Sequence, residues 1–147
     1  MPAPRSTAPA TDLTPSVGLE FISMQRLACY GSCPVYDLFI LTDGGVLYQG
    51  EEHVAAKGLR HVVLSPQALA SLRAAIERSG FMSTDEDCCR SQDTTDQPSV
   101  NLTVSLGGVE KTIFHYLGSK QGHNLKALEN EIDEIVGTDR WIEPPDD

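Results

Sequence analysis

The residues best able to do chemistry in this chain of 147 amino acids are its four cysteines, which form two close pairs. Cys29 and Cys33 are separated by three residues, and one of these, Gly31, can adopt the positive φ that a tight reversal needs. Cys88 and Cys89 are adjacent and lie in a stretch rich in aspartate. Close cysteines act in proteins as a disulfide, as metal ligands, as a redox dithiol or as reduced thiols in the core.

The surroundings of Cys29 and Cys33 favour a structural disulfide. Closing so short a loop removes little entropy from the unfolded chain, so the bond is worth the low end of about 2–4 kcal/mol. A zinc site would also need Cys88 and Cys89, but adjacent cysteines match the wider spacing of zinc ligands poorly. A redox dithiol usually lies at a helix N-terminus, whereas Pro34 and the apolar run after it predict a strand. Reduced buried thiols, a redox switch and a zinc-binding module remain as alternatives.

Histidines and acidic residues give weaker signals. The four histidines share no spacing that would place two of them on one helix face, so each is expected to be an ordinary surface or strand residue. They are His53, His61, His115 and His123.

Residues 82–98 show no periodicity and carry the carboxylates of Asp85, Asp87, Asp93 and Asp96. Calcium binds such oxygens, but the stretch lacks the glycine and the closing glutamate of an EF-hand. An irregular stretch of this length is more often functional or mobile than incidental. We expect a solvated acidic loop that is a candidate for binding, without a metal.

The sequence contains no recognisable catalytic arrangement. It has no Ser-His-Asp or Cys-His pattern, no glycine-rich phosphate loop and no defensible pair of carboxylates. Nucleophilic catalysis by Cys29 or Cys33 would need a nearby base, and the sequence identifies none. We therefore expect no catalytic residue and no cofactor, and an enzyme is the minority interpretation.

The elements that must position these side chains are predicted from periodicity and turn residues. Asp43-Gly44 and Gly107-Gly108 are typical hairpin turns, and the runs beside them predict strands. Asp37 interrupts the most apolar strand, so it must lie on an open face of the sheet or be paired. Strands are predicted at residues 19–28, 35–41, 46–50, 59–64, 100–106 and 109–116.

Two amphipathic helices are predicted. Ser65 and Pro66 begin the first, Gly80 ends it, and Leu69, Leu72 and Ile76 form its apolar stripe. Asn124 is expected to cap the second, which Gly137 ends. Its apolar stripe consists of Leu125, Leu128, Ile132 and Ile135, and its predicted solvent-facing residues are Glu129, Glu131, Asp133 and Glu134.

Runs of strands followed by helices indicate an α+β fold. We predict an antiparallel sheet of five or six strands with two amphipathic helices packed on one face. The predicted organisation is a flexible Ala/Pro/Thr-rich tether at residues 1–17, a single domain at 18–142, and a disordered acidic tail at 143–147.

Several motifs are spread along the chain. Residues 29–36 read CYGSCPVY, residues 43–50 read DGGVLYQG, residues 95–98 read TDQP, and residues 132–142 read IDEIVGTDRWI. Together they resemble the pattern of an uncharacterised bacterial domain family, a domain of unknown function with a C-[FY]-G-x-C-P-x-Y signature. The resemblance implies the fold and the domain boundary but no activity. Cys88 and Cys89 depart from the pattern.

Composition limits the partners. With 11 basic and 21 acidic residues, the formal charge of −10 argues against binding to nucleic-acid phosphates. No apolar run is long enough to cross a bilayer. The tether lacks the apolar core of a signal peptide, but such segments often follow a removed signal. We expect a non-catalytic binding or accessory domain of the bacterial envelope with a protein partner, the cytoplasm being the alternative location. The other hypotheses are a thiol-dependent protein using Cys29, Cys33, Cys88 and Cys89, and an acidic immunity or inhibitor protein.

Overall fold

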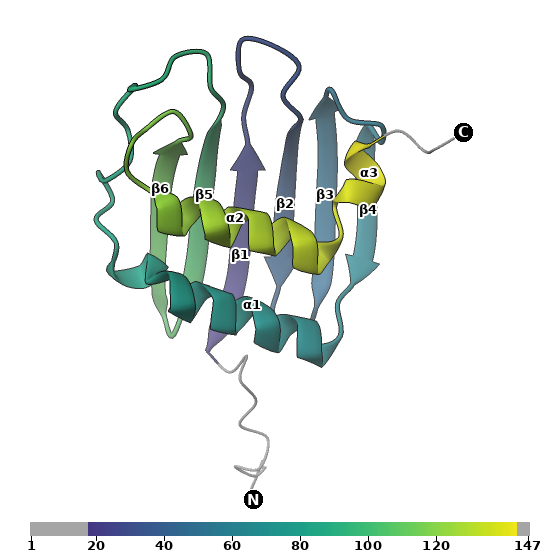
Figure 1. Ribbon diagram of the computed structural model, residues 1–147. Coiled ribbons are helices and arrows are strands. Elements are labelled where there is room, and N and C mark those ends of the chain that lie inside the picture. The colour runs from purple at the N-terminus through teal and green to yellow at the C-terminus, as the bar shows by residue number, and fades with distance from the viewer. Residues whose placement is uncertain (1–17, 144–147) are drawn as a thin grey trace, which may run out of the picture.

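The computed structural model describes residues 18–143 and contains one antiparallel sheet of six strands, in the order β4-β3-β2-β1-β5-β6. Helices α1 and α2 lie side by side across one face of this sheet (Figure 1). The predicted α+β architecture is therefore confirmed. The predicted tether at residues 1–17 and residues 144–147 of the predicted tail lie outside the described residues.

All six predicted strands are present, with shifts of one or two residues at some ends. β1 ends at Arg26 rather than at Ala28, because the chain leaves the sheet before Cys29. The strands are β1 (Leu19–Arg26), β2 (Val35–Leu41), β3 (Gly45–Glu52), β4 (Gly58–Val63), β5 (Ser99–Leu106) and β6 (Val109–Tyr116).

Alternation along the strands divides their side chains between a helix-covered face and an open face. Pairing of Ile22 with Ile40 and with Val104 places these three side chains together under the helices. Removing such apolar surface from water is the main driving force for the fold. The buried residues of this face are Ile22, Met24, Tyr36, Leu38, Ile40, Val46, Tyr48, Val100, Leu102, Val104 and Ile113.

Helix α1 (Pro66–Ser79) has the ends that its sequence predicts. The Ser65 hydroxyl accepts a hydrogen bond from the Ala68 amide at 3.1 Å. Gly80 ends the helix at φ 71°, a conformation that costs glycine little. The chain then enters a short 3₁₀ turn, η2 (Phe81–Ser83), and Phe81 is fully buried. Of the predicted stripe, Leu69, Leu72 and Ile76 are all buried.

Helix α2 (His123–Val136) differs from the prediction at its start. Gly122, not Asn124, is the N-cap residue, and it makes no side-chain cap. The Asn124 amide instead donates to the Ser79 carbonyl at 2.9 Å and to the Thr84 hydroxyl at 3.2 Å. Asn124 therefore ties α2 to the segment after α1.

The buried face of α2 also contains a residue that was predicted to face water. Glu129 is fully buried, and Val136 takes the buried place predicted for Ile135, which is half-buried. Glu129 falls between Leu125 and Ile132 at spacings of four and three residues, so helix geometry places it on the apolar stripe.

The chain end packs back on the sheet through helix α3 (Asp139–Ile142). The Trp141 ring lies 4.7 Å from the Tyr48 ring, centroid to centroid. The Ala56 amide donates to the Trp141 carbonyl at 2.8 Å, which joins α3 to the β3–β4 connection (Figure 1). No helix among residues 18–143 is long and apolar enough to cross a membrane.

Candidate functional site

Asp133 is the centre of a hydrogen-bonded cluster under the end of α2. Its Oδ1 accepts from the hydroxyls of Tyr36 and Thr138, each at 2.8 Å. Its Oδ2 accepts from Arg26, with Nη2 at 2.7 Å and Nε at 2.9 Å. Asp133 was predicted to face water, but its side chain is only 19% exposed. We call Arg26, Tyr36, Asp133 and Thr138 the Asp133 cluster.

The cluster joins sequence motifs that are far apart in the chain. Tyr36 ends the CYGSCPVY motif, and Asp133 and Thr138 belong to the IDEIVGTDRWI motif. Tyr36 lies opposite Arg26 in the β1–β2 pairing, so both side chains reach α2 from neighbouring strands. These two motifs are separated in the sequence, and the fold brings them into contact.

Electrostatic interactions of Asp133 with Arg26 and Tyr36 stabilise the Asp133 cluster. Burial opposes the charge of Arg26, but Asp133 raises the pKa of this guanidinium above its ordinary value. Burial and the negative charge of Asp133 also raise the pKa of the Tyr36 hydroxyl. Arg26 therefore stays charged and Tyr36 stays a donor, as the geometry of the hydrogen bonds requires.

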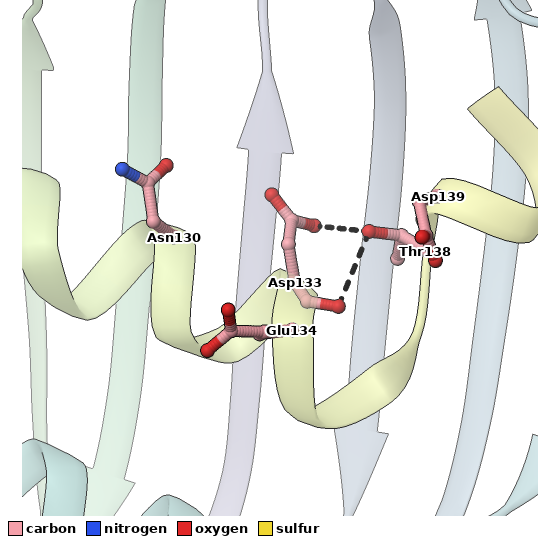
Figure 2. Close-up of a pocket in the computed structure, with 5 residues that line it drawn as sticks. All are labelled: Asn130, Asp133, Glu134, Thr138 and Asp139. Carbon is pink, nitrogen blue, oxygen red and sulfur yellow. Dashed lines mark hydrogen bonds between the residues drawn. The ribbon is translucent and has the colours of Figure 1, made fainter. Parts of the chain in front are cut away.

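A hollow of about 260 Å³ borders the solvent side of this cluster (Figure 2). It is lined by Asp133 and Thr138 of the cluster and by Asn130, Glu134 and Asp139. Figure 2 shows the Asp133 carboxylate turned toward Thr138, whereas Glu134 points away from both. Both Asp133 oxygens already accept hydrogen bonds within the protein. The arrangement is that of a structural contact that holds the end of α2 to β1 and β2, rather than that of a ligand site.

The rest of the closing motif also has structural roles. Gly137 ends α2 at φ 80°, and its amide donates to the Asp133 carbonyl at 2.8 Å. Arg140 donates to the carbonyls of Val136 and Gly137 at 2.7 and 2.8 Å. These last carbonyls of α2 have no partner within the helix, so Arg140 caps it.

Both cysteine pairs are disulfides. Cys29–Cys33 closes the β1–β2 connection and leaves Tyr30 at its tip 89% exposed. Cys88–Cys89 lies in the loop before β5, far along the chain from the first pair. All four sulfurs are engaged in these bonds, and among residues 18–143 no group of three His, Cys, Asp or Glu side chains is arranged to hold a metal ion.

The disulfides make a simple labelling prediction. Alkylation of denatured, unreduced protein should leave all four cysteines unlabelled, and added zinc should not change Tm. Peptide mapping by mass spectrometry measures the first outcome and thermal unfolding the second. A zinc site would instead give thiols that label only after chelation and a Tm that rises with zinc concentration.

The carboxylates of the acidic loop make separate local contacts and do not converge on one site. Asp85 Oδ1 accepts from the Asp87 amide at 3.0 Å. Asp93 accepts from the Ser91 hydroxyl and from the Lys120 amide, and these bonds lower its pKa. Asp96 adopts a positive φ of 66° in a turn. The loop is held to β6 and its following turn, since the Tyr116 hydroxyl donates to the Thr94 carbonyl at 2.7 Å.

One buried ionisable pair was missed by the sequence analysis. His115 lies in strand β6, within the prediction of a surface or strand residue, and it is only 2% exposed, with its Nδ1 2.8 Å from Glu129 Oε2. The pair joins β6 to α2 beneath the surface. A signal existed in the sequence, because Glu129 interrupts an apolar stripe at helical spacing. Nothing in the sequence indicated that His115 would meet it.

The open face of the sheet carries a cluster of apolar side chains on β1 to β4. Phe21 pairs with Leu41 and Phe39 with Leu47 across adjacent strands, and the Phe21 and Phe39 rings lie 5.5 Å apart. We call this cluster the apolar open face. It consists of Phe21, Phe39, Leu41, Leu47, Leu59 and Val63.

Asp37 lies on this same face, as its interruption of an apolar strand predicted. It stands opposite Gln25 and Gln49 on the neighbouring strands. Burial, followed by the negative charge of Glu51, raises its pKa. Among residues 18–143 the Asp37 carboxylate forms no ion pair, and it lies beside an apolar surface.

These features define a small two-layer α+β domain in which no helix among the described residues covers the second face of the sheet. The chain belongs to the family described as domain of unknown function DUF6438, which matches residues 20–136. The match runs from the start of β1 to the last residue of α2, and it confirms the family resemblance. A comparison with curated proteins found no match.

Proposed function

We propose that the chain is a non-catalytic binding domain of the bacterial cell envelope, and that a protein partner binds its apolar open face. The observation that carries this proposal is the exposure of large apolar side chains on one side of one sheet. Leu47 is 45% exposed, Leu59 66% and Val63 69%. Contiguous apolar surface of this kind is uncommon on monomers and marks interaction sites.

The charges around the apolar open face indicate a basic partner. Asp37 and Glu51 repel each other on this face, and a cationic group placed between them would relieve the repulsion. Among the described residues of β1 to β6, no Lys or Arg stands at an open-face position of the sheet pairings. A second copy of the chain would bring more acid to this face, so self-association is disfavoured.

The shape of the face favours an amphipathic helix of the partner. Two helices already cover the opposite face, and a helix on this one would complete a three-layer arrangement of the same kind. Such a helix would present an apolar stripe bordered by Lys or Arg. An acidic immunity or inhibitor protein is the special case in which the basic partner is a toxin or an enzyme.

Both disulfides support the envelope as the location. Disulfides persist in oxidising compartments and are rare in the reducing cytoplasm. The family match is compatible with either the envelope or the cytoplasm. The relevant evidence is therefore whether the cysteines are oxidised or reduced in living cells. Trapping the protein in cells with an alkylating reagent before lysis measures it.

A synthetic amphipathic peptide with a leucine stripe and flanking lysines is the probe for the binding face. We expect it to bind the full chain with a Kd on the order of micromolar in isothermal titration calorimetry. The same peptide with glutamates in place of lysines should not bind. Leu47→Asp should weaken binding at least about tenfold, because it places a charge at the centre of the contact.

Two further variants separate the face from general effects. Val109→Asp is the matched control, since Val109 is 59% exposed but lies at the β5–β6 hairpin, away from the apolar open face. It should bind as the wild type does. Asp37→Asn should weaken binding of the lysine peptide, and binding to the wild type should weaken as pH falls and Asp37 is protonated. Equal binding by all three variants would contradict the proposal.

A further inference from the structure

His115 and Cys89 of the Cys88–Cys89 disulfide border one space beside Gly122, and His115 contacts the buried carboxylate of Glu129; the binding function uses none of them. Glu129 is fully buried, and its Oε1 has no hydrogen-bond partner among the described residues. Burial raises its pKa, and the hydrogen bond with His115 acts in the opposite direction. A buried carboxyl group with only one of its oxygens hydrogen-bonded stabilises a core poorly compared with apolar residues of the same volume. A chemical role is the alternative explanation for keeping it.

Gly122 brings the free side of the His115 ring next to Cys89. A Cβ on Gly122 would lie 2.7 Å from His115 Nε2 and 3.2 Å from Cys89 Sγ, so both atoms border the space that glycine leaves empty. The Tyr116 amide donates to the Cys89 carbonyl at 2.9 Å, which holds Cys89 alongside the residue that follows His115. Nε2 and Cys89 Sγ therefore border the same small space beside Gly122, while Nδ1 contacts Glu129.

The two sulfurs differ in access. Cys89 is 1% exposed, whereas Cys88 is half-buried at the edge of the core. A hollow of about 80 Å³, lined in part by His115, Gly122 and Lys126, opens beside the ring. A nucleophile from solvent would therefore attack Cys88, and Cys89 would be the leaving sulfur beside His115.

We propose that Cys88–Cys89 is a thiol-exchange centre with His115 as its acid–base residue and Glu129 as the residue that positions the ring. Its substrate is a thiol of positive or neutral charge. Cys29–Cys33, for which no buried histidine–carboxylate pair is found nearby among residues 18–143, is the structural disulfide. The proposal is independent of binding at the apolar open face.

The chemistry balances with two equivalents of a thiol. A substrate thiolate forms a bond to Cys88 Sγ, the Cys88–Cys89 bond breaks, and Cys89 Sγ takes the electron pair. His115, as the imidazolium, gives its Nε2 proton to this sulfur and becomes a neutral imidazole, while its Nδ1–H stays hydrogen-bonded to Glu129, which holds the ring in place. A second substrate thiolate then attacks the substrate sulfur of the mixed disulfide and releases Cys88, which takes a proton from solvent. The substrate is oxidised to its disulfide and the protein becomes a dithiol.

The charges near Cys88 select the substrate. Asp85, Glu86 and Asp87 are exposed next to it, and Arg90 pairs with Asp87 at 3.7 Å. A negatively charged thiol would be repelled from this loop and a cationic one attracted. Salt should reduce the difference, because exposed charges are screened.

Reduction of the folded, full-length protein by cysteamine tests the proposal, with 3-mercaptopropionate as the anionic probe. Samples are quenched with an alkylating reagent and mapped by mass spectrometry. Cys88 and Cys89 should label at least about tenfold faster than Cys29 and Cys33. Cysteamine should react faster than 3-mercaptopropionate at equal thiolate concentration, and more so at low salt.

The variants His115→Asn and Glu129→Gln assign the roles. His115→Asn should slow reduction of Cys88–Cys89 about 10²-fold, and Glu129→Gln about tenfold, with the Cys29–Cys33 rate unchanged. The second disulfide is an internal control, because general loosening of the fold would speed both. If His115→Asn does not fold, Glu129→Gln carries the test, since it keeps a hydrogen bond to the ring.

The pH dependence of the ratio between the two reduction rates separates acid–base chemistry from packing. The ionisation of the reductant affects both rates equally and therefore cancels in their ratio. The pH dependence of the ratio should disappear in His115→Asn. The titratable and charged groups around the ring are Glu129, which contacts it, and Lys126 and His123, which line the hollow beside it, while Arg26 and Asp133 act on Glu129. Equal rates for the two disulfides, or variants with unchanged rates, would overturn the proposal.

Discussion

Replacing Asp133 by alanine is expected to lower the free energy of unfolding by about 3 kcal/mol, the low end of the range for breaking a buried ion pair. Arg26 would keep its charge in a site where its side chain is only 15% exposed, with no carboxylate to receive it. The Tyr36 and Thr138 hydroxyls would lose their shared acceptor as well. Urea unfolding followed by circular dichroism measures the change.

Glu134→Ala is the matched control for this substitution. Glu134 is the next residue of α2, borders the same hollow and is exposed (Figure 2). Its loss should change stability by no more than about 0.5 kcal/mol, as is usual for surface positions. Similar losses of stability in the two variants would mean that the Asp133 cluster does not contribute specifically to the stability of this end of α2.

Leu72→Ala is expected to cost about 2–5 kcal/mol, the usual range for emptying a buried leucine site. Leu72 is 0% exposed at the centre of α1, so truncation leaves a cavity between α1 and the sheet. Leu59→Ala is the control of the same chemistry at a side chain 66% exposed on the opposite face. A cost below about 0.5 kcal/mol for Leu72→Ala would show that α1 does not pack as described.

The fold was predictable because its local signals agree with one another. The Ser65–Pro66 start, the Gly80 end and the spacing of Leu69, Leu72 and Ile76 all indicate the same helix, and the structure has it. Strands were found by alternation and by glycine turns, which depend on neighbours in sequence. The prediction that Asn124 caps α2 was wrong, because its side chain hydrogen-bonds to Ser79 of α1 instead. Local sequence preferences carry no information about such a contact between helices.

The candidate sites depend on contacts between distant residues, and the sequence predicts those poorly. Glu129 and His115 are 14 residues apart and lie on different elements, so their pairing follows only from how α2 crosses β6. Cys89 Sγ and His115 Nε2 border one space because Gly122 has no side chain to fill it. The open position of Asp37 was predictable in kind, since an unpaired carboxylate cannot be buried at low cost.

The apolar open face can be tested most directly by an NMR titration of the full chain with the leucine–lysine peptide. Binding there predicts chemical-shift changes at Phe39, Leu47, Leu59 and neighbouring open-face positions of β2 to β4, with little change in α1 and α2. Shift changes confined to the helices, to the acidic loop or to the hollow at the end of α2 would contradict it.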